Sequence, residues 1–169
     1  MIGAIAGDVI GSVYEHAPMR RTDLPLFTPD STWTDDTVLT VATADALLSG
    51  RPYDQAYREW ARRYPHAGYG RTFIGWFHRD DEGPYGSWGN GSAMRVSPIA
   101  YACDTIDAVL AEAARSAAVT HDHAEGIKGA QAAARCRART RGGWTARARS
   151  GRGRSRWRSS TRGSCGTRW

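Results

Sequence analysis

Two adjacent carboxylates and two hydroxyls occur together at residues 34–37, Thr34-Asp35-Asp36-Thr37, at the start of an apolar run. Thr34 can cap that run as a helix by accepting from backbone N–H groups, and Asp35 and Asp36 would then lie in the first turn, where the helix dipole favours anions. The same hard oxygen ligands also suit Mg²⁺. By itself the motif favours the plain cap, because Asp is common in first turns.

Three further polar clusters precede or follow predicted helices, where a scaffold commonly presents binding groups. Glu15 could act as a general acid or base, or be a solvated carboxylate. The glycine-rich stretch before residue 92 could offer N–H donors to phosphates, or be a simple capped loop. The clusters are Asp8 with Glu15, Gly89-Asn90-Gly91-Ser92-Ala93-Met94-Arg95, and Thr120-His121-Asp122-His123.

The spacing of His121 and His123 allows a transition-metal site, but no further ligand follows at a recognisable spacing. Helix capping and hydrogen bonding to a ligand by one imidazole are equal alternatives. The histidine pair therefore leaves three roles open.

Helical spacing of apolar residues predicts the elements that must position these groups. Gly50 and Pro52 are stop signals for the helix that begins at residue 35. No alternating strand of convincing length occurs, so the fold class is predicted to be all-α. The expected helices cover residues 2–13, 35–48, 53–64, 71–77, 91–101, 105–119 and 124–134.

The charge is distributed unevenly along the 169 residues, whose formal net charge is +6. Residues 1–134 contain every acidic residue, whereas residues 135–169 contain 12 Arg, no acidic residue and no Val, Ile, Leu, Met, Phe or Tyr. Such a segment cannot build an ordinary core. We therefore predict a helical domain at 1–134 and a disordered, Arg-rich, low-complexity tail at 135–169.

The composition of this tail agrees with two origins. Its composition is typical of GC-rich DNA read out of frame, which is the preferred hypothesis. The alternative is a genuine basic arm that binds nucleic acid through phosphate contacts, with Trp144, Trp157 and Trp169 as stacking platforms.

The N-terminus is apolar but lacks a basic leader and reaches Asp8 quickly. It is therefore predicted to be neither a signal peptide nor a membrane span, and a cytoplasmic location is the default expectation.

Taken in order, the motifs resemble the ADP-ribosylglycohydrolase family over roughly residues 1–134. The resemblance is carried by Gly3-Ala4-Ile5-Ala6-Gly7-Asp8-Val9-Ile10-Gly11 leading to Glu15, by Thr34-Asp35-Asp36-Thr37, by Gly89-Asn90-Gly91-Ser92-Ala93-Met94-Arg95, and by residues 116–123. It implies the N-terminal portion of an orthogonal multi-helix fold.

The resemblance also implies a chemistry, namely hydrolysis at the ribose C1″ that releases ADP-ribose from a modified protein side chain. Thr34, Asp35 and Asp36 match half of the ligands of a site for two Mg²⁺ ions, and Asp36 also counts as catalytic. Glu15 matches the acidic residue near the scissile bond. The residues that match the ADP-ribose contacts are Gly89, Asn90, Gly91, Ser92 and His121.

The chain departs from the family pattern at its C-terminal side. The second Asp-x-Asp-Thr/Ser motif is absent, since no acidic residue follows Glu125. We therefore expect the chain to be inactive, with apolar faces exposed on residues 38–48 and 105–119. The alternatives are a non-catalytic ADP-ribose- or nucleotide-binding module, or nucleic-acid binding through the Arg-rich tail.

Overall fold

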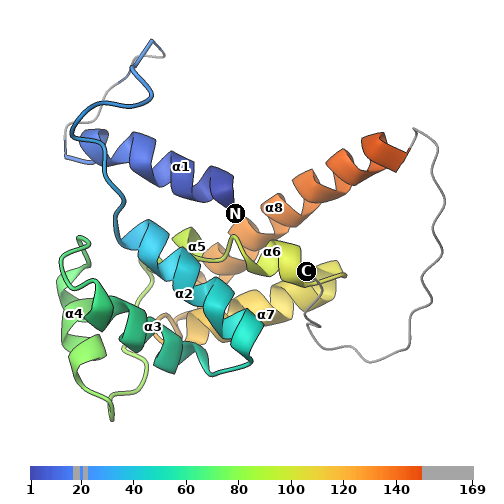
Figure 1. The fold of residues 1–169 in the computed structure, drawn as a ribbon. Helices are drawn as coiled ribbons and strands as arrows, with labels where there is room; N and C mark the ends of the chain where they lie inside the picture. The colour runs from blue at the N-terminus through green and yellow to red at the C-terminus, as the bar shows by residue number, and fades with distance from the viewer. Residues whose placement is uncertain (17–19, 21–22, 150–169) are drawn as a thin grey trace.

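The computed structural model describes residues 1–16, 20 and 23–149, and all regular structure in these residues is helical (Figure 1). The all-α prediction is therefore confirmed. Among the described helices, none combines the length and apolar character that crossing a bilayer requires. The elements are α1 (Ile2–Gly11), the 3₁₀ turn η1 (Ser12–Tyr14), α2 (Asp35–Ser49), α3 (Tyr53–Arg63), α4 (Arg71–His78), α5 (Gly91–Met94), α6 (Ile99–Ala102), α7 (Ile106–Ala118) and α8 (Ala124–Arg149).

Local signals in the sequence set the ends of the two central helices. Thr34 caps α2 by accepting from the Asp36 N–H, and Gly50 ends it in the left-handed conformation at φ 72°. Thr105 caps α7 by accepting from the Ala108 N–H at 3.1 Å. The predicted bounds of both helices agree with the structure to within about a residue.

The expected helix over residues 91–101 is wrong as a single element, because α5 ends at Met94 and α6 begins only at Ile99. Pro98 lies between them and is the N-cap of α6. Proline has no N–H to donate and disfavours helical geometry in the residue before it. The chain therefore turns between the two short helices.

The apolar side chains form two clusters on either side of α2. One cluster joins α2, α3 and α4 around Leu39, Tyr57 and Trp76, and the other joins α6, α7 and α8 around Ile99 and Val109. The expectation that residues 38–48 and 105–119 expose their apolar faces is therefore wrong for most of each helix. The large apolar side chains that are exposed in these two stretches lie at the helix ends, at Leu48 and Ile106.

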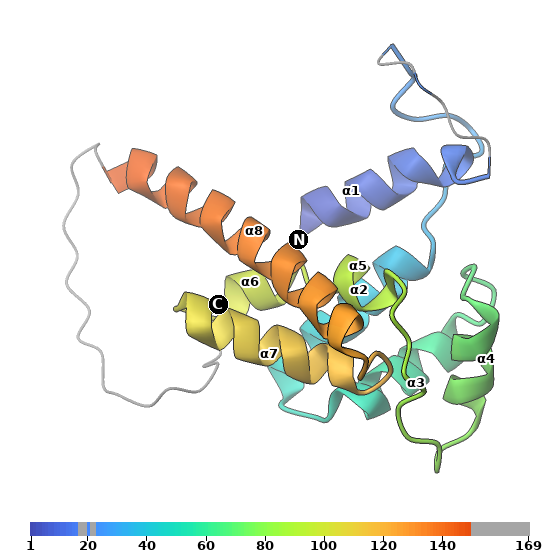
Figure 2. The same ribbon diagram turned by 180° about the vertical axis from the view of Figure 1, so that it is seen from behind.

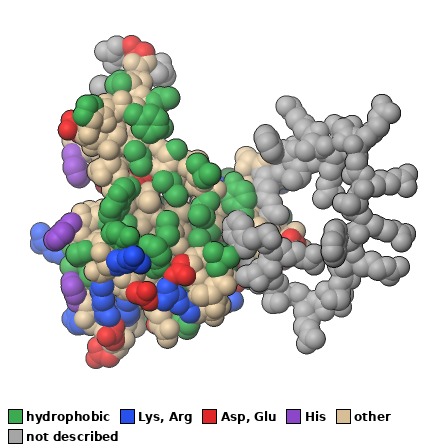
Figure 3. Space-filling model, viewed as in Figure 1, with side chains coloured by type: hydrophobic (Ala, Val, Ile, Leu, Met, Phe, Trp, Pro, Cys, Tyr) green, Lys and Arg blue, Asp and Glu red, His purple; other side chains and the backbone are tan. Residues whose placement is uncertain are grey.

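The helix that lacks buried residues is instead α1, which lies apart from the main body in Figures 1 and 2. No atom would contact a Cβ added at Gly3, Gly7 or Gly11 within 4 Å, so this glycine face packs against nothing in the described chain. Ile2 is 84% exposed, and hydrophobic side chains are visible on α1 and on the face below it in Figure 3.

Helix α8 packs along α7 and then projects beyond the body (Figure 2). The helix does not end at Ala134, where the domain was predicted to end, but continues to Arg149. Up to residue 140, where burial is described, Ala134 is nevertheless the last fully buried position of this helix, and residues 135–137 are exposed. The boundary at residue 134 stays a prediction, and residues 150–169 of the predicted tail lie outside the described part.

Candidate functional site

Asp8 of α1 binds the start of α2 through four hydrogen bonds. Its carboxylate accepts from the backbone N–H and the hydroxyl of Thr34, at 2.8 and 2.6 Å, and from the backbone N–H and the hydroxyl of Thr37, at 3.1 and 2.5 Å. These N–H groups belong to the donors that a helix start leaves unpaired. Asp8 thus fixes the segment that carries Asp35 and Asp36, and this contact is the main tie between α1 and α2.

Asp35 and Asp36 are half-buried and lie in a field of like charge. Burial, followed by the neighbouring carboxylates of Asp36 and Glu15, raises the pKa of Asp35 to about 6. Burial and the carboxylates of Asp8 and Glu15 also raise the pKa of Asp36. No Lys or Arg of the described residues forms an ion pair with either aspartate. We call Asp8, Glu15 and residues 34–37 the carboxylate end of the site.

The carboxylate end has the donor chemistry that suits a hard cation. A cation would relieve the repulsion that raises these pKa values, and Mg²⁺ is commonly held by one or two carboxylates and several waters. The described residues contain no group of three or more His, Cys, Asp or Glu arranged to enclose a metal ion. Asp35 and Asp36 therefore fit as a partial ligand set, completed by waters or other donors.

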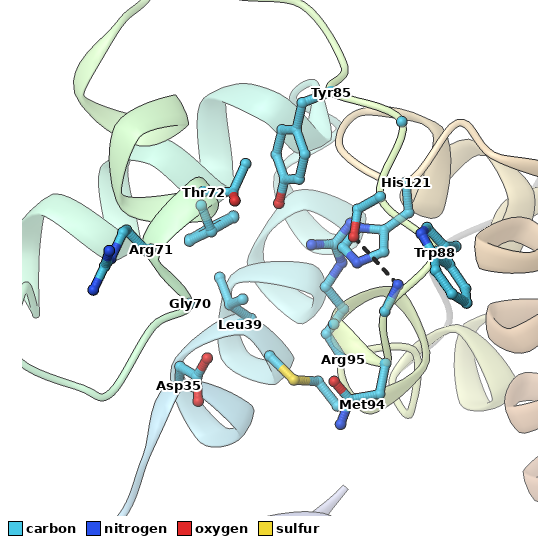
Figure 4. Close-up of a pocket in the computed structure, with 16 residues that line it drawn as sticks. Asp35, Leu39, Gly70, Arg71, Thr72, Tyr85, Trp88, Met94, Arg95 and His121 are labelled. Atoms are coloured by element: carbon cyan, nitrogen blue, oxygen red, sulfur yellow. Dashed lines mark hydrogen bonds between the residues drawn. The ribbon is translucent and has the colours of Figure 1, made fainter.

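Asp35 also lines a pocket of about 650 Å³. Figure 4 shows Asp35 and His121 on opposite sides of this pocket, with the Tyr85 side chain pointing into the space between them. The volume is in the usual range for small-molecule sites. The lining residues are Asp35, Leu39, Gly70, Arg71, Thr72, Phe73, Tyr85, Gly86, Ser87, Trp88, Gly89, Asn90, Gly91, Met94, Arg95 and His121.

The pocket wall formed by residues 85–91 is held by the segment that follows α7. The Gly86 N–H donates to the Asp122 carboxylate at 2.7 Å, and the Ser87 N–H donates to the Thr120 carbonyl at 3.3 Å. Gly86 has φ 65°, a conformation that favours glycine. Two predicted clusters, far apart in sequence, therefore form one wall.

His121 is buried between the starts of α5 and α8. A Cβ at Gly91 would lie 3.1 Å from the His121 Cε1 atom, and a Cβ at Gly126 would lie 2.7 Å from the Ser87 carbonyl oxygen and 3.0 Å from the His121 Cβ. The 2.7 Å distance at Gly126 is too short for a side chain, whereas a Cβ at Gly91 would require His121 to shift slightly. Gly126 is thus needed for the close approach of His121 and the loop, and Gly91 allows it without a shift.

The side chain of Ser92 lies away from the pocket. It is fully buried, and its hydroxyl donates to the Gly126 carbonyl at 2.8 Å, which ties α5 to α8. Glu15 also lies outside the pocket lining and acts on the carboxylate end through its charge. The roles predicted for Ser92 and Glu15 stay predictions.

The two histidines of the H-x-H pair have different environments. Burial, followed by the nearby Arg95 charge, lowers the pKa of His121 to about 4, against an opposing effect of Asp122. His121 is therefore neutral at pH 7. The His123 imidazole accepts from the Glu125 N–H at 3.2 Å at the start of α8. The geometry favours capping by His123 over shared metal binding.

Several groups of the site escaped sequence reasoning. No role was predicted for Asp8, because it lies 26 residues before Thr34 and the sequence gives no local signal of their contact. Tyr85 and Gly126 were not singled out, and Arg95 was noted only as part of a motif. A glycine in the first turn of a helix, directly after His123 and Glu125, is the signal that could have pointed to close packing at Gly126.

Comparison with known proteins gives one family. The model of the family described as ADP-ribosylglycohydrolase matches residues 1–155. The chain is similar to proteins named ADP-ribosylhydrolase ARH3, with 33% identity over 168 residues to that of Mus musculus, 32% over 166 residues to that of Homo sapiens, and 28% over 162 residues to that of Xenopus tropicalis. Each match covers 77% of this chain and 45 to 46% of the relative, so the chain spans about half the length of these relatives.

Proposed function

The chain belongs to the ADP-ribosylglycohydrolase family, and from this premise we propose that it carries the ADP-ribose pocket and half of the metal site of an Mg²⁺-dependent hydrolase. The reaction is removal of ADP-ribose from a modified protein side chain by attack at ribose C1″. The observation that carries the proposal is the pocket itself, which gathers Asp35, the glycine-rich loop and His121 from three distant segments.

The two ends of the pocket have distinct parts in this proposal. Thr34, Asp35 and Asp36 would hold the metal, and Asp8 keeps them in place through its four hydrogen bonds. When bound, Mg²⁺ supplies Lewis-acid polarisation and a template for hydroxyl groups. Glu15 lies beside these carboxylates as the acidic group for proton transfer near the scissile bond.

The other end would hold the nucleotide part of the ligand. Residues 89–91 supply backbone groups in a glycine-rich loop, where Gly89 and Gly91 carry no side chain that would hinder the approach of a diphosphate. Tyr85, Trp88 and Phe73 line the same pocket and offer aromatic surface to a base. The two ends lie on opposite sides of one pocket (Figure 4), an arrangement that suits an elongated ligand with a reactive ribose and a distal nucleotide.

Titration calorimetry of the full chain with ADP-ribose, in Mg²⁺ and in EDTA, tests the proposal. We expect binding that is tighter in Mg²⁺ and loses this metal dependence in Asp36→Asn, whereas Asp81→Asn, at an exposed acidic residue, serves as the control. Release of ADP-ribose from a mono-ADP-ribosylated protein is measured in parallel. A folded chain that does not bind ADP-ribose in Mg²⁺ would contradict the proposal.

A non-catalytic ADP-ribose-binding module is the second candidate. It is favoured by the small number of metal ligands that the described residues bring together. Binding of ADP-ribose that is equally tight in Mg²⁺ and in EDTA, without any release from the modified protein, would favour this module over the metal-dependent proposal.

Nucleic-acid binding through the Arg-rich tail is a separate proposal, and most of that tail lies outside the described residues. It predicts affinity that falls steeply with salt and disappears on deletion after Ala134. Filter binding of a labelled oligonucleotide over a range of salt concentrations measures both effects.

A further inference from the structure

Arg95 is a buried cation without a carboxylate partner. Its side chain is fully buried, it lines the pocket, and none of the ion pairs among the described residues includes it. Its Nη2 atom donates to the Ser116 carbonyl and to the Thr120 hydroxyl, both at 2.8 Å, whereas its Nε and Nη1 atoms have no hydrogen-bond partner. The Tyr57 ring lies 4.1 Å from its Cζ atom.

The other buried arginine of the described residues, Arg58, has a structural role. Both of its Nη atoms donate to backbone carbonyls, those of Trp76, Arg79 and Glu82, and they hold the loop after α4. Its Nε atom, like that of Arg95, has no partner, but no Nη atom of Arg58 is left unpaired. Arg95 ties down no comparable loop. Its uncompensated charge instead gives the adjacent pocket floor a positive potential, which favours an anionic ligand group.

The bond from Arg95 to Thr120 also determines where the Thr120 proton goes. A guanidinium has no acceptor, so the Thr120 Oγ1 atom must accept from Arg95. Oγ1 lies 2.8 Å from the His121 Nδ1 atom and contacts no other hydrogen-bonding group of the described residues. Thr120 is fully buried, and a hydroxyl proton without an acceptor there would be costly. The hydroxyl therefore donates to Nδ1.

This arrangement leaves the single imidazole proton of His121 on Nε2. The Nε2 edge of the ring faces Gly91, since a Cβ there would lie 3.2 Å from Nε2, and His121 lines the pocket beside the glycine-rich loop. Nε2 makes no hydrogen bond within the described chain. The ring thus presents an unused donor at the pocket wall.

We propose that Arg95 and Thr120 are positioning residues that lock His121 as the Nε2–H tautomer, so that this neutral ring donates a hydrogen bond to a phosphate oxygen of the ligand. The ligand identity rests on the proposed function, but the tautomer does not. The charged and titratable groups that face His121 are Arg95, Asp122 and Tyr85. Burial, followed by the Arg95 charge, lowers the pKa of His121 to about 4 against the opposing effect of Asp122, so the ring stays neutral at pH 7.

The tautomer can be measured directly in the ligand-free full chain. We expect a long-range ¹H–¹⁵N spectrum at pH 7 to show the proton of His121 on Nε2, assigned by its loss in His121→Gln. Thr120→Val should shift the equilibrium toward the Nδ1–H form, and Thr120→Ser should restore Nε2–H. Thr43→Val is the control, because it removes another buried hydroxyl that contacts Tyr57 but not His121.

Ligand binding provides the second measurement. Thr120→Val should lower the affinity for ADP-ribose and for inorganic pyrophosphate by about tenfold, which is the effect of losing one hydrogen bond to a charged group. Thr120→Ser and Thr43→Val should leave both affinities within about twofold of the parent.

An Nδ1–H or doubly protonated His121 in the parent chain would overturn the proposal, even if Thr120→Val does not fold. An unchanged tautomer, or an unchanged pyrophosphate affinity, in a folded Thr120→Val variant would do so too. If the parent chain binds no ADP-ribose, the proposed function is contradicted. The spectrum of the ligand-free chain still shows which tautomer His121 adopts.

Discussion

At one end of the pocket Asp35 and Asp36 lie half-buried among further carboxylates, whereas at the other end the Arg95 guanidinium lies fully buried behind a neutral imidazole. We call Arg95, Thr120, His121 and the two glycines that enclose them the histidine end. Among the described residues, Asp35 and Asp36 have no cationic partner and Arg95 has no carboxylate partner. An elongated ligand that brings a metal to one end and a phosphate to the other would satisfy both.

The two ends also differ in how they are held. The carboxylate end depends on α1, which has no buried residue, and on one carboxylate that crosses from α1 to α2. The histidine end lies between α5, α7 and α8, next to a core that includes Val109 and Ala130. The histidine end is thus held by packing, while the carboxylate end is held mainly by polar contacts.

The largest effect is expected from Asp8→Ala, which breaks the carboxylate end alone. It removes all four hydrogen bonds to Thr34 and Thr37 and should lower the free energy of unfolding by about 2 to 4 kcal/mol. It should also abolish any gain in stability on adding Mg²⁺. Urea denaturation with and without Mg²⁺ measures both, and Asp81→Asn is the exposed control. A loss no larger than that of the control would show that α1 does not hold the site.

A matched pair of glycines in α8 tests the packing of the histidine end. Gly126→Ala places a Cβ 2.7 Å from the Ser87 carbonyl oxygen, so we expect a loss of about 2 kcal/mol in unfolding free energy and weaker ADP-ribose binding. Gly129→Ala meets no atom within 4 Å and should stabilise by up to about 1 kcal/mol through helix propensity. Thermal denaturation of the two variants compares them, and equal behaviour would contradict the close packing at Gly126.

Sequence alone predicted the features that depend on local signals. The Thr34 cap and the Gly50 stop are both determined within a few residues, and the structure has each of them. The single helix over residues 91–101 was wrong although Pro98 was visible, because the apolar spacing was given more weight than the proline.

The electrostatic character of the site could not be predicted in the same way. The bond from Asp8 to Thr37 spans 29 residues, and the effect of Arg95 on His121 depends on how α5 packs against the end of α7. The exposure of helix faces was also misjudged, since α2 and α7 bury their apolar sides while α1 does not. Tertiary contacts of this kind leave no periodic signal in the sequence.

The pH dependence of stability tests whether the imidazole at the histidine end is neutral. The pKa of His121 in the folded chain, about 4, is below the ordinary value of 6.5, so the unfolded chain binds a proton first as the pH falls. His121 should therefore cost stability progressively between pH 6.5 and pH 4, by about 2 kcal/mol in total. The difference in unfolding free energy between the parent and His121→Gln, followed over this range, isolates the effect. A difference that does not change with pH would mean that His121 is not shielded.

The smallest change in stability is expected from Asp35→Asn at the carboxylate end. The substitution removes one member of a group of repelling carboxylates, so the free energy of unfolding in EDTA should rise, by about 1 kcal/mol because the group is partly solvent-screened. In Mg²⁺ the ranking should reverse, since the parent gains from the metal and the variant has lost a ligand. Asp107→Asn, at an exposed residue in the first turn of α7, controls for removing a helix-start charge. If Asp35→Asn destabilises the chain in EDTA as well, Asp35 stabilises the start of the helix. Repulsion among the carboxylates would then not destabilise the metal-free chain.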